Sequence, residues 1–173
     1  KTASTSPAIT VNPTVFVKLQ LLLPGETAAP GSATGKTGTP TAQTAATPFT
    51  VTVNAVDANW NLLTNASDTV GITTSDANAV LPANTAMASG TQTFSVTLKT
   101  SGTRTVTASD VSDGSKTAST NSVTVNSGAF VKLQLLVPGE NAAPGTGVGK
   151  TGTPSAQTAG NGYTVSVNAV DAN

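Results

Sequence analysis

One short segment carries the side chains with the clearest chemical potential. In "DANWNLLTNASD" the oxygen-bearing residues Asp57, Asn59, Asn61 and Asp68 occupy positions 1, 3, 5 and 12, the spacing of ligands in a calcium-binding loop. The sixth position is Leu62 rather than the glycine of that loop, and the twelfth is aspartate rather than glutamate. Asp and Asn side chains also close turns by bonding their own backbone. The segment therefore predicts either a calcium site or a polar turn.

Two further features invite a binding role. Asp110 and Asp113 in "SDVSDGS" form a second candidate calcium site, which we expect near a junction between repeats. Trp60 is the only tryptophan and stands beside polar residues, so it is either a platform on which a sugar stacks or a cover for one end of the core. We favour the cover, because a buried indole contributes a large apolar area.

A nucleotide site is predicted to be absent. The segment "GSATGKTG" resembles a phosphate loop, but Gly31 and Gly35 enclose three residues where the motif needs four. No helix is expected after it to hold a phosphate at its N-terminus. We interpret the segment as a packed surface loop.

The composition argues against several function classes. The chain has no His and no Cys, so the usual general base and thiol nucleophile are missing. We therefore expect no enzyme activity and no cofactor other than the possible calcium. Eight Lys and Arg balance eight Asp and Glu without a basic cluster, which predicts no nucleic-acid partner. The apolar runs are too short for a membrane-spanning helix.

Residues alternate between apolar and polar types in six short segments, as in strands with one buried face, and a short strand near Ala86 and Met87 would make seven. Turn residues separate them, which predicts an all-β, immunoglobulin-like sandwich of seven antiparallel strands. The expected strands cover residues 15–21, 49–56, 69–73, 86–87, 93–99, 104–109 and 122–126.

The chain is also internally repeated. Residues 16–59 align without a gap with residues 130–173, and 33 of these 44 positions are identical. The opening "KTASTSPAITVN" matches "KTASTNSVTVN" at Lys116, with one residue fewer in the second. We therefore predict three parts: the last strand of a preceding repeat in residues 1–14, a whole repeat in 15–128, and the first strands of the next in 129–173.

Two segments carry a resemblance to a known family. "TPFTVTVNAVDANWN" and "LPANTAMASGTQTFSVTLKTSGTRTVTASD" resemble a bacterial immunoglobulin-like repeat of the invasin and intimin type. The resemblance implies a module repeated in tandem on a large surface or secreted protein, and hence an extracellular or cell-surface location. The chain departs from this pattern in residues 24–48, a loop rich in Pro, Gly, Thr and Ala between the first two strands. We call this loop the insert.

The insert is the expected place for contacts between neighbouring repeats or neighbouring chains, because it is nearly uncharged and limited in entropy by proline. The residues chosen are Pro24, Pro30, Lys36 and Pro40, with their repeats Pro138, Pro144, Lys150 and Pro154.

The links between successive repeats are about three residues long, too short to act as free tethers. The sequence thus predicts a rigid stalk or filament made of end-to-end domains. Two alternatives stay open: an adhesin module that binds a host protein or a glycan, and a spacer in a secreted polysaccharide-degrading enzyme.

Overall fold

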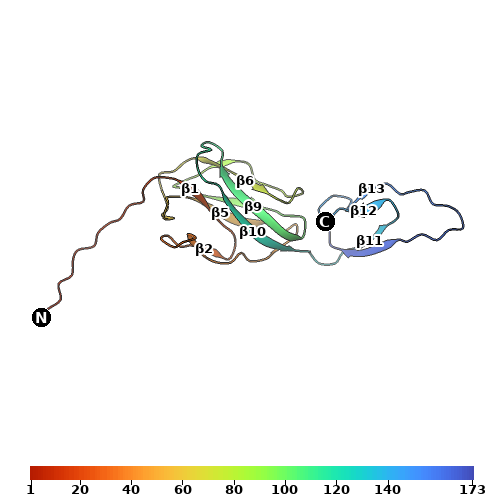
Figure 1. Ribbon diagram of the computed structural model, residues 1–173, viewed down its shortest axis with the longest axis horizontal. Coiled ribbons are helices and arrows are strands. Elements are labelled where there is room, and N and C mark those ends of the chain that lie inside the picture. Colours follow the sequence, from red (N-terminus) through yellow and green to blue (C-terminus); the bar gives the residue numbers. More distant parts are fainter.

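The computed structural model describes residues 1–173, and every regular element in it is a strand. Figure 1 shows an elongated molecule with a strand-rich body in the middle. No helix is present that has the length and apolar character needed to cross a membrane.

Two sheets build the body. The first has the order β1-β5-β8 and the second the order β4-β10-β9-β6-β7. Neighbours in both sheets are antiparallel except β4 and β10, which are parallel. The strands are β1 (Lys18–Leu22), β4 (Gln43–Thr44), β5 (Phe49–Val56), β6 (Thr69–Thr74), β7 (Thr85–Ala86), β8 (Thr91–Val96), β9 (Gly102–Asp110) and β10 (Ser119–Asn126).

Each of the seven predicted strands overlaps one of these. Six of them carry the period-2 sequence pattern, whereas β7 consists of two exposed residues. The short β4 was not predicted, since its two residues carry no such pattern. The all-β class is confirmed.

The two sheets share one hydrophobic core. Its members alternate along the strands of both sheets and include Leu19, Leu21, Val51, Val53, Phe94, Val96, Val70, Ile72, Val106, Ala108, Val123 and Val125. The sheets also curl toward each other at their edges. The Leu19 amide donates to the Thr117 carbonyl at 2.9 Å on one side, and Val80 bridges Thr97 on the other. These contacts provide hydrogen-bond partners for edge strands that would otherwise be open.

The insert forms a hairpin of its own, made of β2 (Glu26–Ala28) and β3 (Lys36–Gly38), with Glu26 opposite Gly38. Pattern analysis missed these two strands because three-residue strands on an exposed loop show no apolar alternation.

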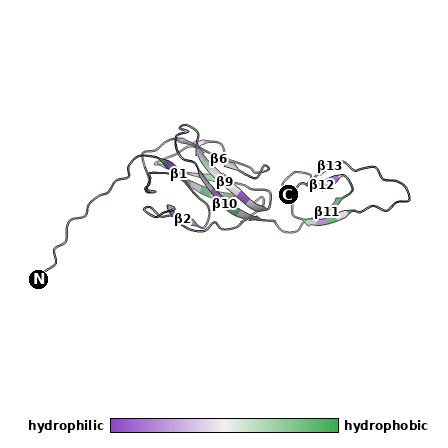
Figure 2. Ribbon diagram, in the orientation of Figure 1, coloured by the Kyte–Doolittle hydropathy of each residue, from purple (hydrophilic) through white to green (hydrophobic).

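The second copy, residues 130–173, repeats part of this plan. It contains β11 (Lys132–Leu136) paired with β14 (Ser166–Val170) and β12 (Glu140–Ala142) paired with β13 (Lys150–Gly152). Hydrophobic residues of β11 remain at the surface (Figure 2).

Residues 1–14, predicted to be the last strand of a preceding repeat, contain no strand and are exposed. Their counterpart β10 pairs with β9, whereas no strand lies beside residues 1–14. The segment therefore runs away from the body in extended form (Figure 1).

Candidate functional site

Asp57 lies directly after β5 at one end of the body, and its carboxylate binds the segment that precedes β1. We call residues 57–61 the Asp57 loop. Asp57 is 1% exposed. Its Oδ1 accepts hydrogen bonds from the Asn59 amide at 2.8 Å and the Asn61 amide at 2.9 Å, and its Oδ2 accepts one from the Thr14 amide at 3.1 Å. The bond from the Asn61 side chain, followed by these backbone bonds, holds the pKa of Asp57 well below its usual range.

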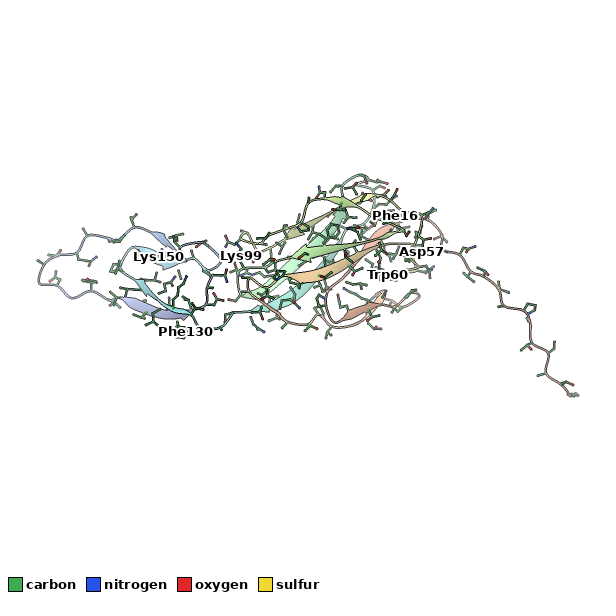
Figure 3. The ribbon with its side chains drawn as sticks, turned by 180° about the vertical axis from the view of Figure 1, so that it is seen from behind. Phe16, Asp57, Trp60, Lys99, Phe130 and Lys150 are labelled. Carbon is green, nitrogen blue, oxygen red and sulfur yellow. The ribbon has the colours of Figure 1, made fainter.

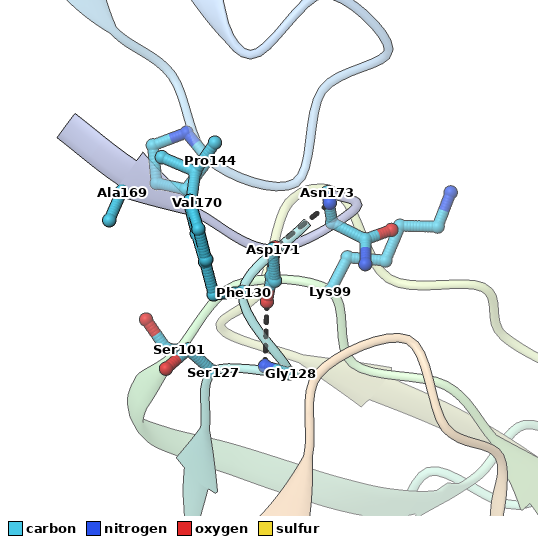
Figure 4. Close-up of a pocket in the computed structure, with 10 residues that line it drawn as sticks. All are labelled: Lys99, Ser101, Ser127, Gly128, Phe130, Pro144, Ala169, Val170, Asp171 and Asn173. Atoms are coloured by element: carbon cyan, nitrogen blue, oxygen red, sulfur yellow. Dashed lines mark hydrogen bonds between the residues drawn. The ribbon is translucent and has the colours of Figure 1, made fainter. Parts of the chain in front are cut away.

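The same arrangement occurs one repeat later. Asp171 Oδ2 accepts a hydrogen bond from the Gly128 amide at 2.7 Å, and Oδ1 accepts one from the Asn173 amide at 2.9 Å (Figure 4). Gly128 and Asp171 stand 114 positions after Thr14 and Asp57. In both copies, therefore, an aspartate at the end of a strand holds the segment that leads into its own unit.

The predicted calcium ligands do not gather around Asp57. The structure brings Asn59 and Asn61 to that carboxylate, but Asn61 offers its Nδ2 group and both residues offer amide hydrogens rather than oxygen ligands. Asp68, the fourth predicted ligand, makes no bond to Asp57, and its pKa is raised by burial and by Asp110 nearby. No group of three or more His, Cys, Asp or Glu side chains suited to a metal ion is present. The turn interpretation accounts for the observed bonds at Asp57.

Trp60 packs against the insert and is absent from the apolar core. Lys18 Nζ lies 3.4 Å from the centroid of the indole ring and donates to the Ala58 carbonyl at 2.9 Å. Gly35 approaches the ring so closely that a Cβ placed on it would lie 2.1 Å from a ring carbon. Trp60 and Asp57 lie at the same end of the body (Figure 3). The indole thus fixes the insert to this end rather than covering the core.

A buried ion pair ties the insert to its own unit. Lys36 Nζ lies 2.9 Å from Glu26 Oε1, and the Glu26 side chain is 3% exposed. Glu26 Oε2 also accepts bonds from the Leu23 amide at 2.9 Å and from Asn121 Nδ2 on β10 at 2.5 Å. Burial favours the neutral acid, but the Lys36 and backbone bonds outweigh it and lower the pKa of Glu26.

Four of the eight insert residues chosen from the sequence make polar contacts within their own unit. Lys36 pairs with Glu26, and Lys150 Nζ lies 2.7 Å from Glu140 Oε1. The carbonyls of Pro24 and Pro138 accept bonds from the Thr41 and Ser155 amides, which close the base of the insert. Pro40 and Pro154 follow the second strand of each hairpin. Lys36 and Lys150 therefore each form an ion pair within their own unit.

Pro144 is the exception, because it lies against the body. Asn78 Nδ2 donates to the Pro144 carbonyl at 3.2 Å. A Cβ on the next residue, Gly145, would lie 2.7 Å from Thr100 Oγ1 and 3.0 Å from Asn78 Nδ2. A cavity of about 270 Å³ lies beside this contact, and Lys99, Ser101, Phe130 and Pro144 are among the residues that line it (Figure 4). The tip of the second insert thus contacts the far end of the body.

The loops that receive this tip are held by another buried aspartate. Asp76 Oδ2 accepts bonds from the Lys99 amide at 2.6 Å and the Thr100 amide at 2.9 Å, while Oδ1 accepts one from the Asn78 amide at 3.0 Å. Burial raises the pKa of Asp76, but the bonds from Thr100, Asn78 and Lys99 outweigh it, so the net direction is downward. The sequence analysis missed Asn78 and Thr100 because they lie outside the duplicated segment.

Comparison with known proteins identifies no family. No protein-family model matches the chain. No curated protein matches it either.

Two solved structures resemble part of the chain. One is a β-glucuronidase of Parabacteroides merdae, with 8% identity and a TM-score of 0.45 over 66% of this chain and 13% of that one. The other is a glycosyl hydrolase family 2 member from Bacteroides cellulosilyticus, with 14% identity and a TM-score of 0.44 over 66% of this chain and 15% of that one. The chain is an all-β domain similar to a small part of these enzymes and spans about one seventh of their length.

Proposed function

We propose that the chain is a structural repeat protein whose units join end to end into a rigid rod, such as a stalk or filament. In this proposal each unit is an immunoglobulin-like sandwich, the protein is extracellular or at the cell surface of a bacterium, and it has no enzyme activity. The observation that carries the proposal is the junction between the body and the second copy. There the tip of the second insert, Pro144 and Gly145, lies near the link, residues 127–129, and near the loops that Asp76 holds, which contain Asn78 and Thr100.

Two fixed points at the junction limit rotation of one unit against the next. The Asp171 carboxylate accepts a hydrogen bond from the Gly128 amide in the link. This bond restricts rotation about the backbone of the link. The Asn78 side chain and the close approach of Gly145 to Thr100 form a second point away from the link. Two contacts that are separated in space restrict bending more than a link alone, because bending must break one of them.

The repeat supplies the same surface at the other end of the body. Pro30 and Gly31 are the counterparts of Pro144 and Gly145. Gly31 has a φ of +76°, close to the +82° of Gly145, yet nothing lies within 4 Å of a Cβ built on it. The Gly31 amide donates to the Asn59 carbonyl at 2.8 Å. This bond stabilises the tip of the first insert in a backbone conformation close to that of the second tip. We infer that Gly31 receives the Asn78 and Thr100 loops of a preceding unit.

The test compares Gly145→Ala with Gly31→Ala in the chain 1–173. Both changes impose a left-handed backbone on alanine, but only the first adds a methyl group against Thr100. We expect ¹⁵N relaxation to give one rotational correlation time for the body and the second copy in the wild type and in Gly31→Ala. In Gly145→Ala the second copy should tumble faster than the body.

Independent tumbling of the two regions in the wild type would overturn the rod. So would a Gly145→Ala variant that tumbles as the wild type does.

A second candidate is a spacer domain beside the catalytic domain of a secreted polysaccharide-degrading enzyme. The two structures reported above are glycoside hydrolases, and the chain matches a small part of each. Both candidates use the unit as a spacer, and this likeness does not choose between them. The sequence that flanks the repeats in the full gene product would decide, because a catalytic domain there supports the second candidate.

An adhesin module that binds a glycan or a host protein is the third candidate. Trp60, the residue best suited to stack on a sugar, has Lys18 over its ring and Gly35 against it. A glycan array probed with the chain would support this candidate if it gave a signal that Trp60→Ala abolished.

A further inference from the structure

Two aspartates lie close together at the end of the body where the chain enters from residues 1–14, beside Thr14 and Phe16. Asp68 immediately precedes β6, and Asp110 is the last residue of β9. The antiparallel pairing of β6 with β9 sets Val70 opposite Asp110, which brings the two acids together although 42 positions separate them. The Asp110 carboxyl group lies close enough to Asp68 to raise the pKa of that acid. Because the sheet fixes both backbones, the two carboxyl groups cannot simply move apart.

One oxygen of this pair has no partner. Asp110 is 7% exposed, and its Oδ1 accepts bonds from the Ser112 amide at 2.9 Å, the Ser112 hydroxyl at 2.8 Å and the Asp113 amide at 2.9 Å. Its Oδ2 is buried and receives no hydrogen bond. A buried carboxylate oxygen without a donor is costly, so such a group calls for a proton or a cation.

The nearby ammonium group does not fill this role. Lys116 Nζ lies 2.9 Å from Asp113 Oδ2 and 5.2 Å from the centroid of the Phe16 ring. Three carboxylates, those of Asp68, Asp110 and Asp113, therefore face one ammonium, which leaves an excess of two negative charges when all are ionised. Burial and the contact with Asp110 raise the pKa of Asp68, as expected where like charges are close.

The surroundings suit an ion with many oxygen ligands. Asp68 lines a depression, and Asp110 lies beneath it in the sheet. The lining also includes Thr14, Asn65, Ser67 and Ser112, all of which carry side-chain oxygens, and Lys116, which is paired with Asp113. Calcium binds six to eight oxygen ligands in flexible geometry, and these include carboxylate, carbonyl and water oxygens. Magnesium demands near-octahedral geometry and gives up its water reluctantly.

We propose that Asp68 and Asp110 bind a calcium ion at this end of the body. Neighbouring side-chain oxygens and water complete its coordination. The ion supplies Asp110 Oδ2 with its missing partner and balances the two excess charges. With only two protein carboxylates the site is a weak one, and we expect a dissociation constant on the order of 10⁻⁴ to 10⁻³ M, as in extracellular calcium modules.

Titration calorimetry and thermal melting of the chain 1–173 in metal-free buffer test the proposal, with CaCl₂ as the probe and MgCl₂ as the comparison. We expect one calcium per chain and a melting temperature raised by about 5 °C at 10 mM CaCl₂, with a much smaller shift in MgCl₂. Asp68→Asn should abolish both calcium effects. Because Asp68 is only half-buried, we expect this variant to fold. Asp110→Asn should do the same, with circular dichroism as the check that it folds.

Asp57→Asn and Asp171→Asn are the matched controls, because each removes a carboxylate outside the pair. Both should retain calcium binding. Loss of binding in Asp57→Asn with retention in Asp68→Asn would place calcium in the Asp57 loop and overturn the proposal. Absence of any heat or melting shift up to 20 mM CaCl₂ would also overturn it, and would mean that the two acids share a proton. Neither result depends on whether the units form a rod.

Discussion

The first copy, residues 16–59, and the second, residues 130–173, have nearly the same sequence and the same local structure but very different surroundings. Strand pairing is identical: Lys18 opposes Val56, and Lys132 opposes Val170. Yet Leu21 is fully buried in the body while Leu135 is 51% exposed. The second copy has no counterpart of β8 or of the five-stranded sheet beside it.

The polar contacts of the insert survive this difference. Gln20 Nε2 donates to the Gly35 carbonyl at 2.7 Å, and Gln134 Nε2 donates to the Gly149 carbonyl at 2.6 Å. The Glu–Lys pair also forms in both copies. The comparison teaches that the insert hairpin is specified by its own residues and the adjacent strand pair, whereas burial of the apolar face needs the second sheet.

The largest expected effect comes from the core. Leu21→Ala should lower the free energy of unfolding of the body by about 2–5 kcal/mol, because it leaves a cavity among packed side chains. Leu135→Ala should change it by less than about 0.5 kcal/mol, because Leu135 lies outside that core. Urea unfolding followed by the fluorescence of Trp60, the single tryptophan, measures both. Equal effects would show that the second copy is part of the same cooperative unit.

The next effect separates the two inserts. Gly35 and Gly149 have φ values of +75° and +74°, so alanine at either position is strained by about 1–2 kcal/mol. Only Gly35→Ala also drives a methyl group into the Trp60 ring, which should add about 1–3 kcal/mol. Hydrogen exchange of amides in β2–β3 and β12–β13 reports each hairpin separately. If Gly149→Ala were as damaging as Gly35→Ala, the contact with Trp60 would not matter.

A smaller difference is expected at the ion pairs. Glu26→Gln should destabilise the body by about 1–3 kcal/mol, since the buried side chain loses its charge toward Lys36 and Asn121. Glu140→Gln should have a lesser effect, because the second copy has no equivalent of Asn121. Urea unfolding of the body and hydrogen exchange of β12–β13 measure the two. A larger effect at Glu140 would contradict this account of the pair.

The smallest effect is a pH dependence. The pKa of Glu26 is lowered from 4.5 in the folded state, so its stabilising contribution is complete above that value and is lost as the pH falls through the lower folded value. The gap in unfolding free energy between the wild type and Glu26→Gln should therefore narrow between pH 6 and pH 3. Urea unfolding monitored by Trp60 fluorescence across this range gives the difference in unfolding free energy at each pH. A difference that does not change with pH would show that the lowered pKa of Glu26 does not contribute to stability.

Much of the fold was predictable because apolar alternation is a local signal. The strand that contains Leu19 and Leu21 and the strand that contains Val51 and Val53 were both found from period 2 alone. The duplication was also visible directly. The β2–β3 hairpin was not, because its stability comes from Glu26, Lys36 and Asn121 rather than from a repeated apolar pattern.

The candidate sites were less predictable. The oxygen-ligand spacing at Asp57 is the same whether the carboxylate binds an ion or closes a turn, and only its N–H partners show which bonds it makes. The contact between Asn78 and Pro144 joins a loop of the body to the second insert, over 66 positions of sequence. No local pattern encodes such a pair.

The sequence by itself determined the strands that carry an apolar alternation and the repetition of the same parts after 114 positions, because both depend only on residues that are neighbours along the chain. Only the tertiary structure decided which copies of the same leucines are buried, which end of the unit receives the insert tip, and that Asp68 faces Asp110. The physical reason is that burial and carboxylate contacts depend on what the opposite sheet and the neighbouring unit bring within a few ångströms.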